Sequence, residues 1–319
     1  KTGLRLKPKS NNRAGPAGGS GPPGNLRPPQ NATARLIFLA SPPRNPENSS
    51  MNRGYWNRLA DRYEDEIFSV LAHDRAALVA AAVRRCGRPD QTATDVGCGI
   101  GHFLPLLAAN FRRVLAVDLS PRNVARARAR FPRLANVDYR AADLAAPRAR
   151  LPAADFALCV NVVISPDLAV RRRILDVVAR HLRPGGHLVL VVPALESILL
   201  TDFRLVEWNL RDGQSPARAA GAGFRAFRSV RRPRLHEGVV PIAGVATKHY
   251  LRDEIAALLE ARGLRPLEFA KIEYPWTSEF AAPPRWMQAP YPWDWLCVAR
   301  KAPARAKPKS KIRPKGPRP

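Results

Sequence analysis

Short apolar runs alternate with amphipathic stretches between residues 92 and 192, and this alternation constrains the fold more than any other feature of the chain. The runs predict five strands: Thr92–Val96, Arg113–Asp118, Val137–Ala141, Phe156–Val160 and His187–Val192. Helical spacing occurs at about residues 102–110, 121–131 and 167–182. Strands joined through helices require right-handed crossovers, so the pattern predicts a parallel, doubly wound α/β sheet.

The segments after residue 193 extend this sheet. A predicted helix over residues 251–262 stops at Gly263, and further strands near 267–274 and 293–300 are joined by loop alone. Two strands joined in this way predict an antiparallel pair at the sheet edge. We expect a Rossmann-like sheet, mostly parallel with an antiparallel edge strand, with helices on both faces. A small cap is predicted to be inserted after the fifth strand, at residues 194–247.

The charge of the chain is concentrated at its two ends. Lys and Arg number 53 against 26 Asp and Glu, a formal net charge of +27 that by itself favours a polyanionic partner. Residues 1–54 hold nine of the basic residues and one acid, and residues 301–319 hold eight and no acid. The Pro-rich tails at 1–50 and 303–319 are predicted to be disordered, around a folded domain at 51–302. They are interpreted as solubilising tails, with weak contact to RNA or another polyanion as the alternative.

The cysteines favour no disulfide or metal. They lie far apart, without a C-x-x-C pair or a histidine at ligand spacing: Cys86, Cys98, Cys159 and Cys297. This pattern predicts reduced thiols and no metal site. The chain has no run of 18 apolar residues, so no membrane span is predicted either. Together these features predict a cytoplasmic protein.

A glycine-rich turn with an acid before it follows the first strand. Residues 95–101 read D-V-G-C-G-I-G, and alternate glycines let a backbone turn sharply and approach a ligand closely. Asp118 ends the neighbouring strand, where a carboxylate can accept both hydroxyls of a ribose. The dinucleotide fingerprint needs a small residue at the position of His102, and a pyrophosphate would be repelled by Asp95. The turn therefore favours a cationic ligand without phosphate, such as S-adenosylmethionine.

Several later segments strengthen this interpretation. The run 95–101 resembles motif I of the class I S-adenosylmethionine-dependent methyltransferases. The segments Ala142-Asp143-Leu144, Asn161, L-R-P-G-G-H-L at 182–188 and Lys248-His249-Tyr250 resemble that family's later motifs in the same order. The similarity covers about residues 51–301 and is nearest to the type-11/type-12 methyltransferase domains, which act mostly on small molecules. It implies S-adenosyl-L-methionine as the cofactor.

The resemblance also implies roles for individual residues. It assigns cofactor contacts to Asp95, Gly97, Cys98, Gly99, Gly101, Asp118, Leu119, Ala142, Asp143, Leu144, Asn161 and Tyr63. The glycines would cradle the methionyl part, Asp95 would meet its amino group, Asp118 the ribose and Asp143 the adenine amino group. Tyr55 and Tyr63 resemble lid residues, with ordinary helix packing as the alternative. Cys98 is interpreted as a small side chain in the turn, because no base accompanies it.

The acceptor side has no readable motif. His249 and Tyr250 are the candidate catalytic residues, because a general base is needed when the acceptor must lose a proton. His236 is a further candidate, and a surface or helix-capping histidine is the alternative for each of these histidines. Arginines between residues 204 and 234 could bind an anionic acceptor, or form a solvated loop. Four tryptophans could line an apolar pocket or pack in the core: Trp276, Trp286, Trp293 and Trp295.

The predicted function is transfer of a methyl group from S-adenosylmethionine to an O, N or C nucleophile of a small-molecule acceptor. One alternative is an RNA or protein methyltransferase guided by the basic tails. Amino-methylating enzymes of nucleic acids usually carry an Asn/Asp-Pro-Pro-aromatic segment, and Asn161-Val162-Val163-Ile164 lacks those prolines. The other alternative is a non-catalytic binding protein with a cofactor fold, against which the intact glycines and acids argue.

Overall fold

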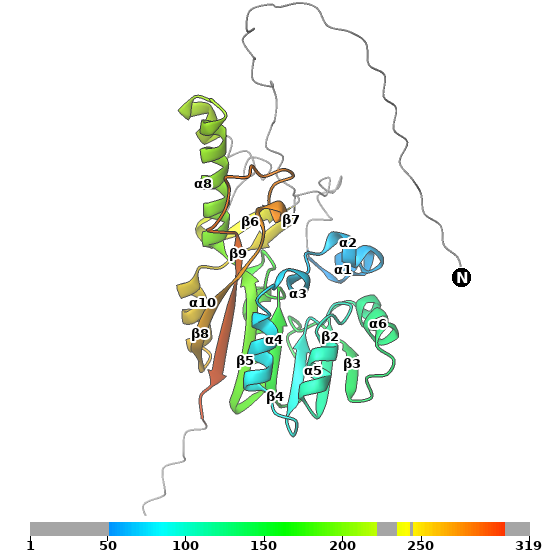
Figure 1. Cartoon of the computed structure of the whole chain (residues 1–319). Helices are drawn as coiled ribbons and strands as arrows, with labels where there is room; N and C mark the ends of the chain where they lie inside the picture. Colours follow the sequence, from blue (N-terminus) through cyan, green and yellow to red (C-terminus); the bar gives the residue numbers. More distant parts are fainter. Residues whose placement is uncertain (1–50, 222–234, 243–244, 304–319) are drawn as a thin grey trace, which may run out of the picture. The chain divides into compact units, whose positions relative to one another are not determined.

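The structure, a computed structural model, describes residues 51–221, 235–242 and 245–303. The disorder predicted for the two tails concerns residues that lie outside these ranges, except for Pro303 at their end. A seven-stranded sheet runs through the described part in the order β3-β2-β1-β4-β5-β9-β8, with helices on both faces (Figure 1). The predicted fold class, a Rossmann-like and mostly parallel α/β sheet, is confirmed.

The strands occupy the positions that the apolar runs predict. They are β1 (Thr92–Val96), β2 (Arg113–Asp118), β3 (Val137–Ala141), β4 (Ala154–Val160), β5 (Leu182–Pro193), β8 (Leu264–Glu273) and β9 (Trp293–Lys301). The first five pair in parallel, and β9 pairs antiparallel with both β5 and β8. The antiparallel edge pair is therefore present, with β8 at the edge and β9 as the strand that opposes its neighbours. All the parallel strands end at one edge of the sheet, which we call the carboxyl edge.

Two groups of helices cover the sheet. One face carries α4 (Leu78–Cys86), α5 (Leu104–Asn110) and α6 (Pro121–Arg130), and the other carries α7 (Leu168–His181) and α10 (Arg252–Glu260). Each group buries an apolar stripe against the strands, such as Val79 and Val83 of α4 and Val178 of α7. The helix starts follow local chemistry: the Ser120 hydroxyl caps α6 ahead of Pro121.

The turn predicted before the fifth strand becomes a bulge within β5. Leu182 pairs with Ala154 and His187 pairs with Phe156, so the residues between Leu182 and His187 have one residue opposite them on β4. A Cβ on Gly186 would lie 2.8 Å from the carbonyl oxygen of Asp155. The bulge therefore needs glycine there because the two backbones approach closely.

The segment before β1 forms several short helices. They are α1 (Arg53–Leu59), the 3₁₀ turn η2 (Ala60–Arg62), α2 (Tyr63–Glu66), α3 (Val70–His73) and α4. Caps interrupt the helical path, because the Ser69 hydroxyl accepts from the amide of Ala72 and the Asp74 carboxylate accepts from those of Leu78 and Val79. In Figure 1, α1 to α3 lie at the carboxyl edge of the sheet.

Residues 194–247 begin with a long helix. The helix α8 spans Leu195–Arg211, and the described residues beyond it form the turn η3 (Leu235–Glu237) and the hairpin β6 (Val239–Ile242) and β7 (Val245–Lys248). Figure 1 draws α8, β6 and β7 at one end of the sheet, and the role of this segment as a cap stays a prediction. No helix within the described ranges is long and apolar enough to cross a membrane.

Candidate functional site: a cofactor pocket at the carboxyl edge

The glycine turn after β1 depends on its glycines for both conformation and space. Gly97, Gly99 and Gly101 have φ values of +69°, +52° and +88°, which side chains rarely adopt. A Cβ on Gly97 would come within 2.3 Å of Val162, and one on Gly101 within 2.8 Å of Leu104. The amides of Gly97 and Cys98 donate to the carbonyl of Val117, at 2.7 and 2.9 Å. The turn therefore wraps closely around the end of β2.

Asp118 is fixed against this turn. Its Oδ2 accepts from the amide of Gly99 at 2.9 Å, and its Oδ1 accepts from the amide of Ser120 at 2.8 Å and from Asn123 Nδ2 at 3.2 Å. Burial raises the pKa of Asp118, and these hydrogen bonds oppose the rise. A carboxylate held in one orientation beside a glycine turn offers its remaining lone pairs to the two hydroxyls of a ribose.

Asp95 presents a buried oxygen without a partner. The residue is 3 % exposed, and its Oδ2 makes no hydrogen bond within the described residues. Burial and the charge of Asp118 raise the pKa of Asp95 to about 7. Buried polar atoms in folded proteins almost always have partners, so an unpartnered carboxylate oxygen fits a site that a ligand completes. An ammonium group is a matching partner for it.

Tyr63 covers the glycine turn from the N-terminal helices. A Cβ on Gly99 would meet the Tyr63 hydroxyl oxygen at 2.4 Å. Burial, with the nearby charges of Asp118, Cys98 and Asp95, raises the pKa of Tyr63 above its usual range. Tyr55, the other predicted lid residue, packs edge-on against Trp56 with ring centroids 5.1 Å apart. Tyr63 is therefore the tyrosine that lies against the predicted cofactor residues.

Polar contacts fasten these helices to the sheet domain. Glu64 of α2 forms an ion pair with Arg130 of α6 and lies 3.7 Å from His102 Nε2. The Ser120 hydroxyl donates to Asn57 Oδ1 at 2.6 Å. We call the segment 53–66, which contains Tyr55 and Tyr63, the lid, and its action as a lid stays a prediction. These contacts hold the lid over the glycine turn.

The loop after β3 lies beside Asp118. The amide of Ala142 donates to the Asp118 carbonyl at 2.9 Å, and Leu144 is buried in the core. Asp143 is exposed and accepts from the amide of Ala145 at 2.8 Å. The loop lines a surface pocket of about 450 Å³ together with Arg140. Leu119 is half-buried next to Asp118. The loop therefore brings the predicted adenine residues to the same edge as the ribose acid.

Asn161 lies between the glycine turn and Asp294 of β9, two strands away in the sheet. It has a φ of +53°, and its amide donates to the Val191 carbonyl at 2.9 Å. Its Nδ2 lies 3.5 Å from Asp294 Oδ2, and its Oδ1 is buried without a hydrogen-bond partner within the described residues. The next residue, Val162, fills the space beside Gly97. Asn161 is thus adjacent both to the cofactor turn and to a buried acid.

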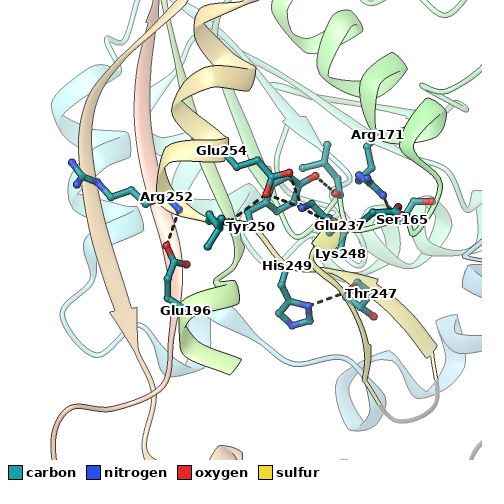
Figure 2. Close-up of polar contacts among 12 residues, drawn as sticks. Ser165, Arg171, Glu196, Glu237, Thr247, Lys248, His249, Tyr250, Arg252 and Glu254 are labelled. Carbon is teal, nitrogen blue, oxygen red and sulfur yellow. Dashed lines mark hydrogen bonds and ion pairs between the residues drawn. The ribbon is translucent and has the colours of Figure 1, made fainter. Parts of the chain in front are cut away.

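His249 and Tyr250 pack inside the domain (Figure 2). The Tyr250 hydroxyl donates to the Val163 carbonyl at 2.5 Å. His249 Nδ1 lies 3.1 Å from the Thr247 carbonyl, and Figure 2 shows its ring near Thr247. Burial lowers the pKa of His249 to about 4, so the imidazole is neutral at neutral pH. The structure thus shows Tyr250 supporting the loop after Asn161, and a catalytic role for either residue stays a prediction.

Lys248 anchors the same region. Its ammonium group is buried, lies 2.6 Å from Glu254 Oε1 and donates to the Glu237 carbonyl at 2.8 Å. Its amide donates to the Ile164 carbonyl at 2.8 Å. Sequence reasoning noted Lys248 only as part of the family-like segment. Its ion pair joins the β7 end to α10 and holds Tyr250 in place.

The remaining candidates on the acceptor side have structural partners. Trp276 stacks on Phe280 against α8, with ring centroids 5.7 Å apart. Arg204 pairs with Glu207 at 2.8 Å, whereas the arginines at 225–234 lie outside the described residues. The His236 side chain is 81 % exposed. Among the residues that the structure describes, no group of three or more His, Cys, Asp or Glu side chains could hold a metal ion.

Sequence reasoning missed three polar residues in β9 and in the segment that joins it to β8. Asp294 of β9 lies next to Asn161, and burial raises its pKa to about 6, against the opposing effect of Tyr274 and Asn161. Burial and the charge of Asp294 raise the pKa of Glu279 to about 7 and that of Tyr274 above its usual range. One signal was available, because Asp294 interrupts the apolar run Trp293 to Leu296.

The sheet order and the glycine turn, with Asp118 at the end of the next strand, are those of a Rossmann-like fold. A solved S-adenosylmethionine-dependent methyltransferase from Mesorhizobium loti shares this fold, with a TM-score of 0.50 and 20 % identity over 73 % of this chain and 100 % of that one. Residues 93–186 match the family model described as a methyltransferase domain. They belong to the class I S-adenosylmethionine-dependent methyltransferases.

Curated relatives share part of the chain. A protein of Mycolicibacterium smegmatis, described as a probable S-adenosylmethionine-dependent methyltransferase, is 33 % identical over 139 residues, 44 % of this chain and 46 % of its own. Trans-aconitate 2-methyltransferase of an Azoarcus species is 31 % identical over 134 residues, 41 % of this chain and 51 % of its own. The chain thus spans about half the length of these relatives.

Proposed function

We propose that this protein transfers a methyl group from S-adenosylmethionine to an O, N or C nucleophile of a small-molecule acceptor. The observation that carries the proposal is the buried, unpartnered Oδ2 of Asp95 beside the glycine turn that holds Asp118. A cationic ligand with a ribose satisfies both acids, whereas the phosphates of a dinucleotide would be repelled by Asp95.

The chain's own residues would bind and orient this cofactor. Asp95 would receive its ammonium group, Asp118 its ribose hydroxyls, and the loop at Ala142–Leu144 its adenine. Tyr63 would exclude water from the glycine turn. The bound sulfonium supplies an electrophilic methyl group, so the protein mainly holds an acceptor in line, and such orientation contributes roughly 7–11 kcal/mol in favourable cases.

Two observations support a small acceptor. The Azoarcus relative is named for a small molecule, trans-aconitate. The segment after β4, Asn161-Val162-Val163-Ile164, also lacks the prolines that are typical of amino-methylating enzymes of nucleic acids. The net charge of +27 favours RNA or protein as the alternative acceptor, guided by the tails. We further propose a cytoplasmic location, which the four free cysteines support.

Labelling tests the function and the acceptor class together. The full chain is incubated with methyl-labelled S-adenosylmethionine and an extract of the source organism, divided into small-molecule, RNA and protein fractions. We expect label in the small-molecule fraction, and at least tenfold less label when the Asp118→Ala variant is used at a subsaturating cofactor concentration. Label confined to RNA or protein would contradict a small-molecule acceptor and favour RNA or protein in its place. Binding of S-adenosylhomocysteine without label in any fraction would contradict the enzymatic function and favour a non-catalytic binding protein.

A further inference from the structure

Buried acids and aromatic rings gather at the carboxyl edge beyond the cofactor pocket. Asp294 is the second residue of β9, and Tyr274 directly follows β8. The amide of Tyr274 donates to the Pro292 carbonyl at 2.8 Å, which keeps these two strand ends together. We call the group formed by Asp294, Tyr274, Glu279 and Asn161 the Asp294 site. None of these four residues forms an ion pair within the described ranges.

The site lies next to the predicted cofactor residues. Asn161 Nδ2 is 3.5 Å from Asp294 Oδ2, and Val162, the next residue, fills the space against Gly97. Asp294 pairs in register with Pro193 at the end of β5, so it is two strands from Asn161, or about 10 Å across the sheet at backbone level. The side chains of Asn161 and Asp294 together bridge that interval. An acceptor held beside Asp294 would thus be adjacent to the turn that binds the methyl donor.

Polar atoms in the site are buried and incompletely satisfied by hydrogen bonds. Tyr274 is 5 % exposed, and its hydroxyl lies close enough to Asp294 to lower that acid's pKa but makes no other hydrogen bond among the described residues. The buried side-chain oxygen of Asn161 makes no hydrogen bond among these residues. Asp294 itself is 8 % exposed. Buried hydroxyl and amide oxygens are normally satisfied, so these atoms fit a site that a ligand completes.

The site also has an uncompensated charge. No Lys or Arg of the described residues forms an ion pair with Asp294 or Glu279, although the chain holds 53 basic and 26 acidic residues. The half-buried Asp155, by contrast, has Arg183 as an ion-pair partner at 2.9 Å. Leaving two acids without cations is costly unless a ligand provides the positive charge.

An aromatic wall borders the acids. The Phe68 and Tyr274 ring centroids are 4.6 Å apart, and the His73 ring stacks on Phe68 at 4.5 Å. Phe68 is 42 % exposed, so one end of this wall reaches the protein surface. Carboxylates next to aromatic rings are the usual environment for an organic cation, because both attract positive charge.

We propose that the methyl acceptor carries a basic amine, and that the Asp294 site binds this amine in its protonated form. Asp294 supplies the charge, Tyr274 and Asn161 supply oxygens to the remaining N–H groups, and Glu279 adds a second negative charge at longer range. The inference rests on the proposed function for its link to methyl transfer. It makes Asp294 and Tyr274 residues that determine acceptor specificity.

A matched series of probes tests the preference for positive charge. Benzylamine, benzyl alcohol and benzoate share one ring and differ in charge, and their binding to the full chain is measured by titration with and without saturating S-adenosylhomocysteine. We expect benzylamine to bind at least tenfold more tightly than benzyl alcohol, and benzoate not to bind. Equal affinity for the amine and the alcohol, or preference for benzoate, would overturn the inference.

Variants locate the preference. Asp294→Asn keeps the shape and removes the charge, so benzylamine should lose at least tenfold in affinity while benzyl alcohol changes little. Tyr274→Phe should lower the affinity for benzylamine about threefold. This variant tests the site if Asp294→Asn does not fold. The matched control is Asp138→Asn, which removes an exposed acid paired with Arg113 on the far strands of the sheet. An amine preference that survives both site variants would contradict the proposal.

The two proposals can fail separately. Binding of S-adenosylhomocysteine is measured in each variant, because Asp294 is not among the cofactor residues and its replacement should leave this affinity unchanged. A wild-type chain that prefers the amine but binds no S-adenosylhomocysteine would contradict the proposed function alone. A chain that binds S-adenosylhomocysteine and shows no amine preference would contradict the inference alone.

Discussion

Asp118 Oδ2 accepts a hydrogen bond from the backbone amide of Gly99 at 2.9 Å. This bond ties the end of β2 to the glycine turn of β1, so the conformation of the turn and the orientation of the acid depend on each other. The carboxylate is thereby oriented before any ligand binds. Such preorganisation reduces the cost of ordering the site upon binding.

Replacing this acid tests the cofactor site. We expect Asp118→Ala to weaken binding of S-adenosylhomocysteine by at least tenfold, or about 1.4 kcal/mol, because it removes the acceptor for the ribose hydroxyls. Calorimetric titration measures the change, with Asp138→Ala as the control at an exposed acid of β3. An unchanged affinity in a folded Asp118→Ala protein would contradict the assignment.

Gly97 is expected to tolerate no side chain. Gly97→Ala combines an unfavourable φ with a contact of 2.3 Å to Val162, whereas Gly213→Ala has a similar φ of +79° and open space. The conformational cost at Gly213 is about 1–2 kcal/mol, and the cost at Gly97 should exceed it. Urea unfolding compares the two variants. A second change, Val162→Ala, should recover part of the loss in Gly97→Ala, and no recovery would show that the contact is not responsible.

His249 should make the fold sensitive to acid. Its pKa is about 4 in the folded chain, because of burial, and about 6.5 when unfolded. The unfolded state therefore takes up the proton first, and stability falls as the pH drops from about 6.5 towards 4. Relative to His249→Gln, the wild-type free energy of unfolding should fall by about 2 kcal/mol between pH 7 and pH 5. His236→Gln, at an exposed imidazole, is the control, and a parallel pH dependence of wild type and His249→Gln would refute the prediction.

Tyr250→Phe separates support from catalysis. The hydroxyl already donates to the Val163 carbonyl, so its loss leaves a buried carbonyl without that donor and should cost about 1–3 kcal/mol of stability. We expect kcat to fall less than tenfold, with the pH profile unchanged. A loss of more than a hundredfold together with a shifted pH profile would instead show that Tyr250 acts on the acceptor's proton.

The cofactor half of the site could be predicted because its signals are local. The glycines at 97, 99 and 101 and the two acids lie within 24 consecutive residues, at spacings fixed by one strand–helix–strand unit. The sheet was predictable for the same reason, since each strand is a short apolar run. The bulge within β5 and the caps at Ser69 and Asp74 were not predicted.

The acceptor half could not be predicted in the same way. Asn161 and Asp294 are 133 residues apart, and their contact depends on β9 entering the sheet beside β5 in the antiparallel direction. No short-range pattern encodes that arrangement. The tryptophans of the same region attracted attention because of their size, and the acid between Trp293 and Trp295 was overlooked.

The lid has a kinetic consequence. Tyr63 lies against Gly99, and Glu64 and Asn57 fasten the same segment to Arg130 and Ser120. If the glycine turn holds the methyl donor as proposed, the donor would enter and leave by breaking these contacts, whereas an acceptor at the Asp294 site would meet the surface beside Phe68. The two ligands would thus use separate routes. The rate at which the demethylated cofactor is exchanged would then be set by the opening of the lid rather than by methyl transfer itself.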